Sequence, residues 1–542
     1  MIKIALDEVK RNEDYNNIIE LLSPPKDITT IGNPGEFRGI KVGIIGGGLA
    51  GLSSAFELRK LGFDITIFET QKNRIGGRVY TYYFDREKRY YGEFGAMRIP
   101  VIHETTWHYI NLFRLRTRPF IQSNKNGIIY IRNKHARNDP EGKSVMRNIY
   151  PEFQLTPKEQ NTPWQKILGN SLGSNIYKLE TSVRKEILQV KKKYSHSIEC
   201  YGRLGIRRVL EEMEVSKGAI ELVSGIIPFL GAFYYNSYYE NLQEEYTVDS
   251  AFRYEIVGGA TNLPLSFYYS LMSKNPKEYP NIDKKYLGNV DLKSGKTVTG
   301  IYKKNNKVTL EYKDKITSQV LFQDFDFIIC AIPFSSLRNI RIYPMFSNGK
   351  MQAIKEVNYV SSQKTIFMCN ERFWERGGVE EKIVGGGSVT DLPIQTIWYP
   401  GYHELINSKN NNSYMEPGAL VASYSIGQDA TRLGNLDDTI RFEEIKRQLE
   451  AVHGFQRGYL DKIVEMHKTV QWNTEEGFYG AFCYFTPEQQ ANFSYSMSIP
   501  EYNNRIYFAG EHISLTHGWI EGAVNTGMKV ANEITTYCKS IK

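Results

Sequence analysis

The chain has 542 residues, of which 41% are hydrophobic and 24% are charged. This size and composition are typical of an ordinary soluble globular protein with roughly two to four domains' worth of core. The formal net charge of +8 is modest over this length, and no dense basic block occurs beyond Lys191–Lys193, so nucleic-acid and membrane binding are not expected.

The N-terminal segment lacks the pattern of a secretory signal. Residues 1–8 have no long apolar stretch and include acidic residues early, so we expect a cytoplasmic protein. Apolar residues at helical spacing from Tyr15 to Leu22 predict an amphipathic helix that ends at Ser23–Pro25. The apolar face of this helix must dock on a later part of the chain.

The stretch from Lys41 to Glu69 has the pattern of a βαβ dinucleotide-binding unit. An apolar strand over 42–45 leads into Gly46-Gly47-Gly48-Leu49-Ala50-Gly51, a helix is predicted over 52–60, and a second strand over 63–69 ends in Glu69. Glycine motifs also mark ordinary tight turns. Here strand, turn, helix, strand and acid follow in register, which favours nucleotide binding.

Each part of this unit has an expected role. Gly46 permits the tight turn, Gly48 lets the backbone approach a pyrophosphate, and Gly51 lets the helix pack closely. The first turn of the helix offers free N–H groups to the phosphates. Glu69 lies where an acceptor for a ribose hydroxyl belongs.

A second glycine pair with an arginine, Arg74-Ile75-Gly76-Gly77-Arg78-Val79, follows the second strand. Plain NAD enzymes do not need such a motif. It is similar to a motif of flavoproteins of the amine-oxidase type, in which the arginine meets the phosphates of FAD. This similarity implies FAD rather than NAD, with Gly77 and Arg78 at the cofactor.

A single arginine stands among apolar residues in Gly95-Ala96-Met97-Arg98-Ile99-Pro100. Arg98 has two interpretations, and the sequence leaves both open. It is either satisfied by a structural carboxylate, or it presents a guanidinium fork to a substrate carboxylate. Arginine suits the second role better than lysine because its contacts with a carboxylate are bidentate.

The middle of the chain separates into a helical part and a β-rich part. Residues from about 140 to 246 read as helical and polar, and their longest apolar run, 222–235, is shorter than the roughly 20 residues that span a bilayer, so we interpret it as core. Strand-like segments at 298–303, 308–312 and 325–333 would complete a nucleotide domain that is split along the sequence. A β-rich pattern follows from 357 to about 485, with a polar loop over 407–413.

The C-terminal part returns to the nucleotide domain. A strand from 505 ends at Gly510-Glu511, and Thr516 to Val524 starts a helix that continues through Met528. Glu511 is expected to hold a ribitol hydroxyl. The N-terminus of the helix would face the electron-rich edge of a flavin, where negative charge develops on reduction, with Trp519 as an aromatic wall.

These elements predict a mixed α/β fold with three parts. The first is a discontinuous Rossmann-like FAD-binding domain of residues 38–80, 256–355 and 500–542. The second is a β-rich substrate-binding domain of residues 5–25, 81–139 and 356–499. An inserted helical domain spans 140–255.

The cysteines are scattered and form no CxxC pair. This pattern indicates free thiols in a reduced intracellular protein and predicts neither a disulfide framework nor a metal site. The five cysteines are Cys200, Cys330, Cys369, Cys483 and Cys538.

Taken together, the chain resembles the L-amino-acid oxidases of the flavin monoamine oxidase superfamily. Besides the nucleotide motifs, the resemblance rests on segments 95–100, 390–393, 485–487, 505–510 and 517–520, which occur in that order. The ordered set is far more specific than any single segment.

The resemblance implies roles for individual residues. Arg98 resembles the carboxylate-binding arginine of the family, and Tyr424 resembles its tyrosine partner. Lys364 resembles the catalytic lysine that holds a water near the flavin N5 atom. Gly518 and Trp519 resemble the backbone and the aromatic surface beside the substrate amine.

The resemblance also implies a set of cofactor contacts. Trp472 resembles the aromatic residue that flanks the flavin, and Phe482 stands at a substrate side-chain position that is often aliphatic, which implies a bulkier wall. The residues expected at FAD are Gly46, Gly48, Leu49, Ala50, Gly51, Glu69, Gly77, Arg78, Gly95, Ala96, Met97, Arg98, Val290, Trp472, Gly510, Glu511, Gly518, Trp519 and Ile520.

The chain departs from the family in two places. Many relatives carry a histidine on a loop at the end of the helical domain, proposed as a base or gate, but 242–246 reads Leu-Gln-Glu-Glu-Tyr. Glu244 and Glu245 would either attract a cationic side chain or form an exposed acidic loop. Monoamine oxidases proper attach FAD through a cysteine near position 482, whereas Cys483 is offset by one residue in a strand and would face away, so FAD is expected to be non-covalent.

The implied reaction is oxidative deamination of L-amino acids with oxygen, giving 2-oxo acids, ammonia and hydrogen peroxide by hydride transfer from Cα to the flavin N5 atom. Tyrosine-rich composition and Phe482 favour large apolar or aromatic substrates. The alternatives are a flavin amine oxidase for amines without a carboxylate, an amino-acid 2-monooxygenase, and a flavin-fold protein without catalysis. A homodimer is common among relatives.

Overall fold

The computed structural model describes residues 1–169, 172–401 and 413–541. Within them a parallel sheet in the order β10–β2–β1–β14–β23 unites distant segments of the chain, as the predicted split α/β fold requires. Its strands are β1 (Lys41–Ile45), β2 (Asp64–Glu69), β10 (Val290–Ser294), β14 (Phe327–Cys330) and β23 (Ile506–Phe508).

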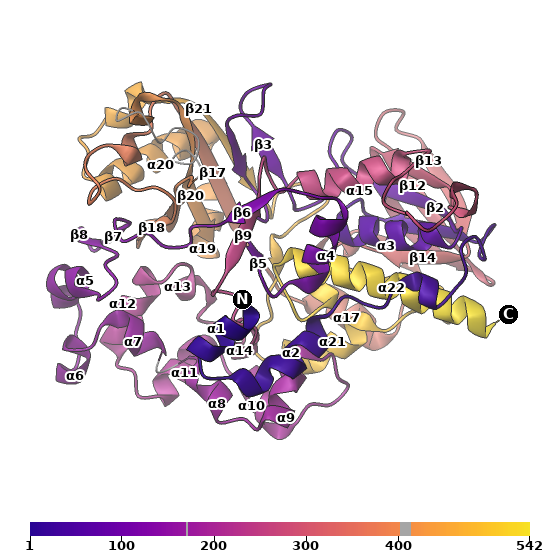
Figure 1. The fold of residues 1–542 in the computed structure, drawn as a ribbon, viewed down its shortest axis with the longest axis horizontal. Coiled ribbons are helices and arrows are strands. Elements are labelled where there is room, and N and C mark those ends of the chain that lie inside the picture. The colour runs from indigo at the N-terminus through magenta and orange to yellow at the C-terminus, as the bar shows by residue number, and fades with distance from the viewer. Residues whose placement is uncertain (170–171, 402–412, 542) are drawn as a thin grey trace.

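The predicted βαβ unit is confirmed, with one shifted boundary. Helix α3 (Leu49–Lys60) joins β1 to β2, and every residue of it is buried. The C-terminal helix α22 (Ile520–Ser540) packs along α3, and α15 (Asn262–Met272) contacts it as well (Figure 1). The helix begins three residues before the predicted start because Gly48, in an extended conformation, already serves as its N-cap.

An antiparallel unit follows on the parallel sheet. It has the order β13–β12–β11–β15, with β11 and β15 parallel to each other. Its strands are β11 (Lys296–Lys304), β12 (Lys307–Asp314), β13 (Val320–Phe325) and β15 (Arg341–Tyr343), and the helices beside it are α16 (Phe334–Leu337) and α17 (Asn348–Glu356).

The β-rich part forms a mixed sheet in the order β21–β17–β20–β19–β18–β7–β8, shown in orange and purple in Figure 1. Its strands are β7 (Ile128–Ile131), β8 (Lys134–Arg137), β17 (Ser362–Cys369), β18 (Gly387–Thr390), β19 (Thr396–Trp398), β20 (Gly418–Ile426) and β21 (Val464–Gln471). The helices α19 (Gln428–Gly434) and α20 (Asp438–His453) contact it.

Short pairings connect these layers. They are β3 (Thr81–Tyr83) with β4 (Tyr91–Glu93), β9 (Arg253–Ile256) between β5 (Ile99–Pro100) and β6 (Thr117–Pro119), and β16 (Tyr359–Val360) with β22 (Phe482–Cys483). The helices α4 (Glu104–Leu112) and α21 (Gln489–Ser498) lie in the same connecting segments.

The segment predicted to be helical is helical. Its helices are α5 (Lys143–Asn148), α6 (Pro157–Gln160), α7 (Trp164–Gly169), α8 (Ser174–Tyr177), α9 (Thr181–Arg184), α10 (His196–Gly202), α11 (Ile206–Glu212), α12 (Lys217–Ile226), α13 (Leu230–Phe233) and α14 (Tyr238–Tyr246). The acidic stretch 242–246 therefore belongs to α14, which corrects the expectation of a loop.

The N-terminal helices α1 (Ile2–Glu8) and α2 (Tyr15–Leu22) dock on this helical part (Figure 1). Leu6 and Ile18 are buried in the same hydrophobic cluster as the helices of 143–246. Arg11 Nη2 donates to the Glu245 carbonyl oxygen at 2.7 Å. Segment 5–25, which we grouped with the β-rich part, thus makes these contacts with the helical part, because its apolar residues join the hydrophobic cluster of that part. The domain boundaries stay a prediction.

None of the described helices combines the length and the apolar content that crossing a bilayer requires. Most of the predicted polar loop, residues 407–412, lies outside the described residues.

Candidate active site

A cavity of about 580 Å³ lies where the parallel sheet, the β-rich sheet and the helical part meet. Almost every residue that we predicted to bind cofactor or substrate lines it. Gly51 and Val290 do not. The fold therefore brings together residues that are far apart in the sequence. Gly48 and Trp519, for example, are about 470 positions apart.

One end of the cavity is a glycine-lined cradle at the N-terminus of α3. A Cβ atom on Gly48 would meet nothing nearer than the Gly77 Cα at 3.9 Å, so the protein leaves room beside Gly48 at this end of the cavity. Glu69 closes this end, and its carboxylate accepts from the N–H groups of Gly47 at 3.0 Å and Gln71 at 2.7 Å. Burial raises the pKa of Glu69.

Gly51 has a structural role instead of a lining role. A Cβ atom there would lie 2.1 Å from the Gly46 carbonyl oxygen. Gly46 itself adopts φ +106°, a conformation that favours glycine. The close packing expected of the third glycine is thus present, although its atoms do not reach the cavity.

The prediction for Val290 is not supported by its position. Val290 lies in β10, paired with Ile65, and packs against the hydrophobic core of the nucleotide part. Residues 296–299 of β11 line the cavity in its place. The alternating pattern of β11 could have indicated Val298. The sequence does not show whether β10 or β11 faces the cavity, however, and the choice between Val290 and Val298 depends on this.

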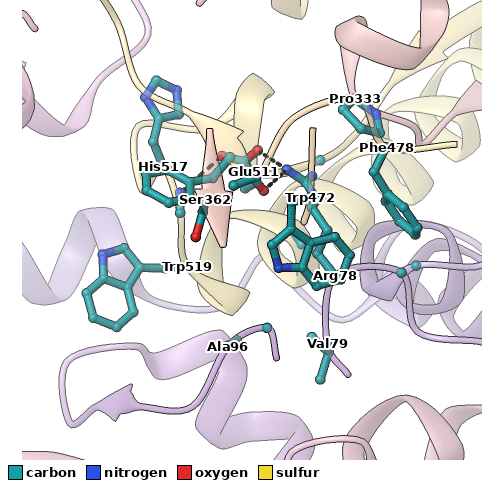
Figure 2. A pocket seen from close by; sticks show the side chains of 18 of the residues that line it. Arg78, Val79, Ala96, Pro333, Ser362, Trp472, Phe478, Glu511, His517 and Trp519 are labelled. Carbon is teal, nitrogen blue, oxygen red and sulfur yellow. Dashed lines mark hydrogen bonds and ion pairs between the residues drawn. The ribbon is translucent and has the colours of Figure 1, made fainter. Parts of the chain in front are cut away.

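Arg78 and Glu511 link the two glycine-containing motifs to the end of the chain (Figure 2). Arg78 Nη1 lies 2.8 Å from Glu511 Oε1 and also donates to the Ala481 carbonyl oxygen at 2.9 Å. Glu511 Oε2 accepts from the Gly518 N–H at 3.0 Å. The Glu511 carboxylate therefore fixes the turn before α22, and this adds a positioning role to the ribitol contact that we predicted.

Two tryptophans stand on different walls of the cavity (Figure 2). Trp472 is buried, and its indole N–H donates to the Phe94 carbonyl oxygen at 3.0 Å. Trp519 packs edge-to-face against His103, with ring centroids 5.2 Å apart. Trp472 is thus held by Phe94, which also lines the cavity, and Trp519 packs on His103, which does not line it.

Lys364 is buried in the centre of the site. Its Nζ donates to the carbonyl oxygens of Gly95 at 2.7 Å and Glu93 at 3.1 Å. Burial, and then the charge of Arg98, lower the pKa of Lys364 to about 7. A lysine of this kind exchanges a proton near neutral pH, which an exposed lysine does not.

Tyr424 on β20 lies opposite Lys364 on the neighbouring strand β17. The residues are directly paired in the antiparallel register of β17 and β20, and Lys364 Nζ lies 4.3 Å from the Tyr424 ring centroid. The sequence separates them by 60 positions. Their contact is therefore a consequence of strand pairing.

Arg98 lines the cavity without a carboxylate partner. No Asp or Glu oxygen lies within 4.0 Å of its guanidinium among the described residues. Its Nη1 donates weakly to Gln122 Oε1 at 3.4 Å, and its guanidinium lies 5.0 Å from the Trp398 ring. The sequence left two interpretations of Arg98 open. The first, in which a structural carboxylate satisfies the guanidinium, finds no such carboxylate in the described residues.

Aromatic rings form one wall beside Tyr424. Phe229 lies 4.6 Å from Tyr424, and Phe233 lies 4.5 Å from Tyr484 and 6.5 Å from Phe482, between ring centroids. All of them line the cavity. We interpreted Phe229 and Phe233 as core because they stand in an apolar run; Pro228 in the middle of that run was the signal that the chain turns there.

Glu244 and Arg253 complete the lining near Arg98. Burial, and then Asp249, raise the pKa of Glu244 to about 7. Arg253 Nε donates to the Asp249 carbonyl oxygen at 2.8 Å, and its guanidinium lies 5.4 Å from the Trp519 ring. We had not predicted Arg253, which no motif marks.

A buried ion pair lies at the cavity wall, and its histidine, His517, is one of the lining residues (Figure 2). His517 Nδ1 is 2.9 Å from Glu240 Oε1, and the same oxygen accepts from the Phe485 N–H at 2.7 Å. Cys483 is fully buried, faces this histidine and is absent from the cavity lining, whereas its neighbour Phe482 lines it. The one-residue offset therefore turns the thiol to the other face of the strand.

The geometry agrees with a comparison to protein families. A family model described as flavin containing amine oxidoreductase matches residues 49–535. The match covers most of the chain and includes most of the segments that line the cavity, although Ile45, Gly46 and Gly48 lie just before it.

Two curated relatives extend over nearly the whole chain. An L-amino-acid oxidase of Crotalus adamanteus is 27% identical over 536 residues, which cover 98% of this chain and 92% of that protein. The L-amino-acid oxidase BmooLAAO-I of Bothrops moojeni is 28% identical over 538 residues, with 98% and 95% covered.

Solved structures share the fold. Putrescine oxidase bound to putrescine has a TM-score of 0.66 at 15% identity, covering 91% of this chain and 98% of that chain. Cyclohexylamine oxidase from Brevibacterium oxydans IH-35A has a TM-score of 0.65 at 18% identity, covering 92% and 99%.

Proposed function

The chain belongs to the flavin containing amine oxidoreductase family, and on this premise we propose that it is an FAD-dependent L-amino-acid oxidase. The proposed reaction converts an L-amino acid, oxygen and water into a 2-oxo acid, ammonia and hydrogen peroxide. The observation that carries the proposal is Arg98, a cation in the cavity that has no carboxylate partner in the described residues.

The residues at the glycine-lined end fit FAD. Gly48 and Gly77 leave a cradle that a side chain would fill, and the N-terminus of α3 opens onto it. Glu69 stands at the end of β2, where a ribose hydroxyl would find an acceptor. Arg78 uses one nitrogen for Glu511 and keeps the rest of its guanidinium for the phosphates.

We propose that FAD is held without a covalent bond. The support is the position of Cys483, whose thiol is buried against His517 and does not line the cavity. Burial raises the pKa of Cys483 to about 11, so the nucleophilic thiolate is also disfavoured.

The substrate carboxylate would pair with Arg98 and accept from the Tyr424 hydroxyl. Both groups line the cavity, and the Tyr424 hydroxyl has no hydrogen-bond partner in the described part of the chain. This anchor orients Cα of the substrate, which converts a random encounter into a positioned reaction. Burial, and then the charge of Arg253, lower the pKa of Arg98 to about 10, which still leaves it charged at neutral pH.

Bound FAD would supply the redox chemistry, accepting hydride from Cα and passing the electrons to oxygen. Lys364 would exchange a proton beside the reacting atoms, because its pKa is near neutrality. Trp519 and Trp472 would exclude water on two sides of the site. Hydride transfer needs no strong base at carbon, so the missing loop histidine is tolerable when the α-amine arrives neutral.

The rings of Phe482 and its neighbours favour a large apolar or aromatic side chain in the substrate. The alternatives are an amine oxidase, which the fold of the putrescine and cyclohexylamine oxidases suggests, and an amino-acid 2-monooxygenase. An amine without a carboxylate would leave Arg98 unpaired in the cavity, which argues against the first. A cytoplasmic location and a homodimer stay predictions.

The test is to measure peroxide release by purified, FAD-loaded protein with each of the twenty L-amino acids, their D-forms and simple amines. Peroxide and a 2-oxo acid from L-amino acids alone would support the proposal. An amide product would favour the monooxygenase, and peroxide from amines alone would favour the amine oxidase. A protein purified without flavin would contradict both the cofactor and the reaction.

A further inference from the structure

Glu244 is a partly buried carboxylate that faces the substrate cavity without a cation partner. It lies on α14 near the end of the helical part. Neither a salt bridge within 4.0 Å nor a side-chain hydrogen bond joins it to any described residue. A charge in such a position is normally paired, because desolvation without compensation is unfavourable.

The two cations nearest to Glu244 are directed elsewhere. Arg253 donates through Nε to the Asp249 carbonyl oxygen and stacks over Trp519. Arg98 points toward Gln122 and Trp398. Asp249 and Glu245 add negative charge around Glu244, and together with burial they raise its pKa. The charge of Arg253 offsets only part of this repulsion, and a cation that entered the cavity would offset more of it.

Glu244 acts on the same rings that form the aromatic wall. Glu244, Tyr424 and Tyr484 line the same cavity, and burial together with the charge of Glu244 raises the pKa of both tyrosines. Phe229 lies 4.6 Å from Tyr424, and Phe233 and Phe482 lie 4.5 Å and 6.1 Å from Tyr484, between ring centroids. Aromatic faces beside a carboxylate are the surroundings in which proteins hold organic cations.

Glu244 also affects the pKa of Arg98, the proposed anchor of the substrate carboxylate. The two opposite charges therefore face one cavity, within electrostatic reach of each other. A molecule with a carboxylate at one end and a cation at the other, joined by an apolar stem, matches this arrangement.

We propose that the cavity selects L-amino acids whose long side chain ends in a cation, with Glu244 as the acceptor of that cation and the aromatic wall around the stem. This inference rests on the proposed oxidase function and replaces the apolar or aromatic side chain favoured there with a long side chain of the lysine, ornithine and arginine class, whose apolar stem the aromatic rings would still contact. Glu244 is thereby a specificity-determining residue.

The test compares L-lysine with L-norleucine, which has the same number of side-chain carbons without the ammonium group. We expect kcat/KM for L-lysine to exceed kcat/KM for L-norleucine by about tenfold or more, because the ammonium group forms a charge-assisted hydrogen bond in a largely buried site. Glu244→Gln should bring the ratio close to one by lowering lysine turnover much more than norleucine turnover. Glu212→Gln, an exposed carboxylate on α11 paired with Arg208, is the matched control and should leave the ratio unchanged.

A second measurement separates this inference from the proposed function. 6-Aminohexanoate and hexanoate carry the carboxylate with and without the terminal cation, and neither has an α-amine to oxidise. Their dissociation constants, followed through the flavin absorbance of the holoenzyme, should favour 6-aminohexanoate by about tenfold in the unmodified protein and not in Glu244→Gln.

The outcomes are distinct. Turnover of norleucine equal to or better than that of lysine would overturn the inference and leave the oxidase function standing. A preference for L-glutamate would assign the side-chain contact to Arg253 and also overturn it. No turnover of any amino acid would refute the oxidase function, and the two hexanoates would then still decide whether Glu244 binds a cation.

Discussion

Glu240 and His517 form a buried ion pair, with Glu240 Oε1 2.9 Å from His517 Nδ1, that joins helix α14 to the turn before α22. The pair connects the helical part, which contributes Glu244, to the segment that contributes Gly518 and Trp519. A shift of this contact would therefore move two walls of the cavity at once.

Glu240→Gln should destabilise the protein by about 3–5 kcal/mol, because it leaves a buried imidazolium without its counter-charge. Burial disfavours the charged ring, but Cys483 and Glu240 raise the pKa of His517 well above its ordinary value. The stabilisation is therefore complete below the unfolded-state pKa of His and is lost as the pH rises through the folded-state pKa. Urea unfolding of both proteins between pH 5 and 9 measures this difference.

The control for this prediction is Glu380→Gln, which removes an exposed pair with Lys125. Its effect should stay within about 1 kcal/mol at every pH. Equal destabilisation by the two substitutions, or a difference for Glu240→Gln that does not depend on pH, would contradict the assigned role of the pair.

Arg98→Ala should lower kcat/KM for amino acids. The fall should correspond to a loss of about 2–5 kcal/mol of transition-state binding, as expected for a carboxylate left unpaired in a dry site. Steady-state kinetics with the best amino-acid substrate measures the loss. Arg208→Ala, which removes a surface arginine, serves as the control and should be neutral. Unchanged activity of Arg98→Ala would assign Arg98 a structural role only.

Lys364→Met should remove a pH dependence of the reaction. Because burial and Arg98 lower the pKa of Lys364 to about 7, the neutral amine predominates above this pH and can accept a proton. The rate of flavin reduction, or of its reoxidation, should therefore rise through about pH 7 in the unmodified enzyme and be flat in the variant. Stopped-flow absorbance separates the two half-reactions.

The same substitution has a thermodynamic signature. The folded-state pKa of Lys364 lies below the unfolded value, so burying the ammonium group destabilises the fold at pH values below about 7. This destabilisation disappears as the pH rises toward the unfolded-state pKa. Lys364→Met should accordingly stabilise the apoprotein more at pH 6 than at pH 10. A stability difference independent of pH would refute the lowered pKa.

Gly51→Ala and Gly48→Ala should fail in different ways. A Cβ atom at Gly51 lies 2.1 Å from the Gly46 carbonyl oxygen, so overpacking should lower stability by about 1–3 kcal/mol or more. A Cβ atom at Gly48 meets no protein atom closer than 3.9 Å, so the apoprotein should keep its Tm. The Gly48 variant should nevertheless lose flavin, because the methyl group fills the cradle; Tm and flavin content after gel filtration distinguish the two. Full flavin retention by Gly48→Ala would argue that the phosphates bind elsewhere.

The parts predicted well from the sequence are those that depend on neighbours along the chain. The βαβ unit follows from hydrophobic runs, glycine spacing and Glu69 at a strand end, all within 30 residues, and its elements appear at the expected places. The start of α3 was displaced because helix N-caps depend on backbone conformation at Gly48, which the residue type does not specify.

The residues that were missed depend on how distant segments meet. Val290 and Val298 stand in similar apolar surroundings in the sequence and pack on two different hydrophobic clusters, and only the tertiary structure shows that Val298 also lines the cavity. Phe229, in an apolar run, was interpreted as core, although the turn at Pro228 carries its ring to Tyr424.

The sequence by itself determined the family resemblance, the nucleotide unit and the identity of most lining residues, because these rest on local order and on chemical type. Only the tertiary structure decided that Arg98 has no carboxylate partner in the described residues, that Lys364 and Tyr424 are cross-strand neighbours, and that Glu244 faces the cavity from a helix. The physical reason is that burial, charge pairing and pKa depend on distances between atoms, and strand pairing and helix docking set those distances between residues that the sequence keeps far apart.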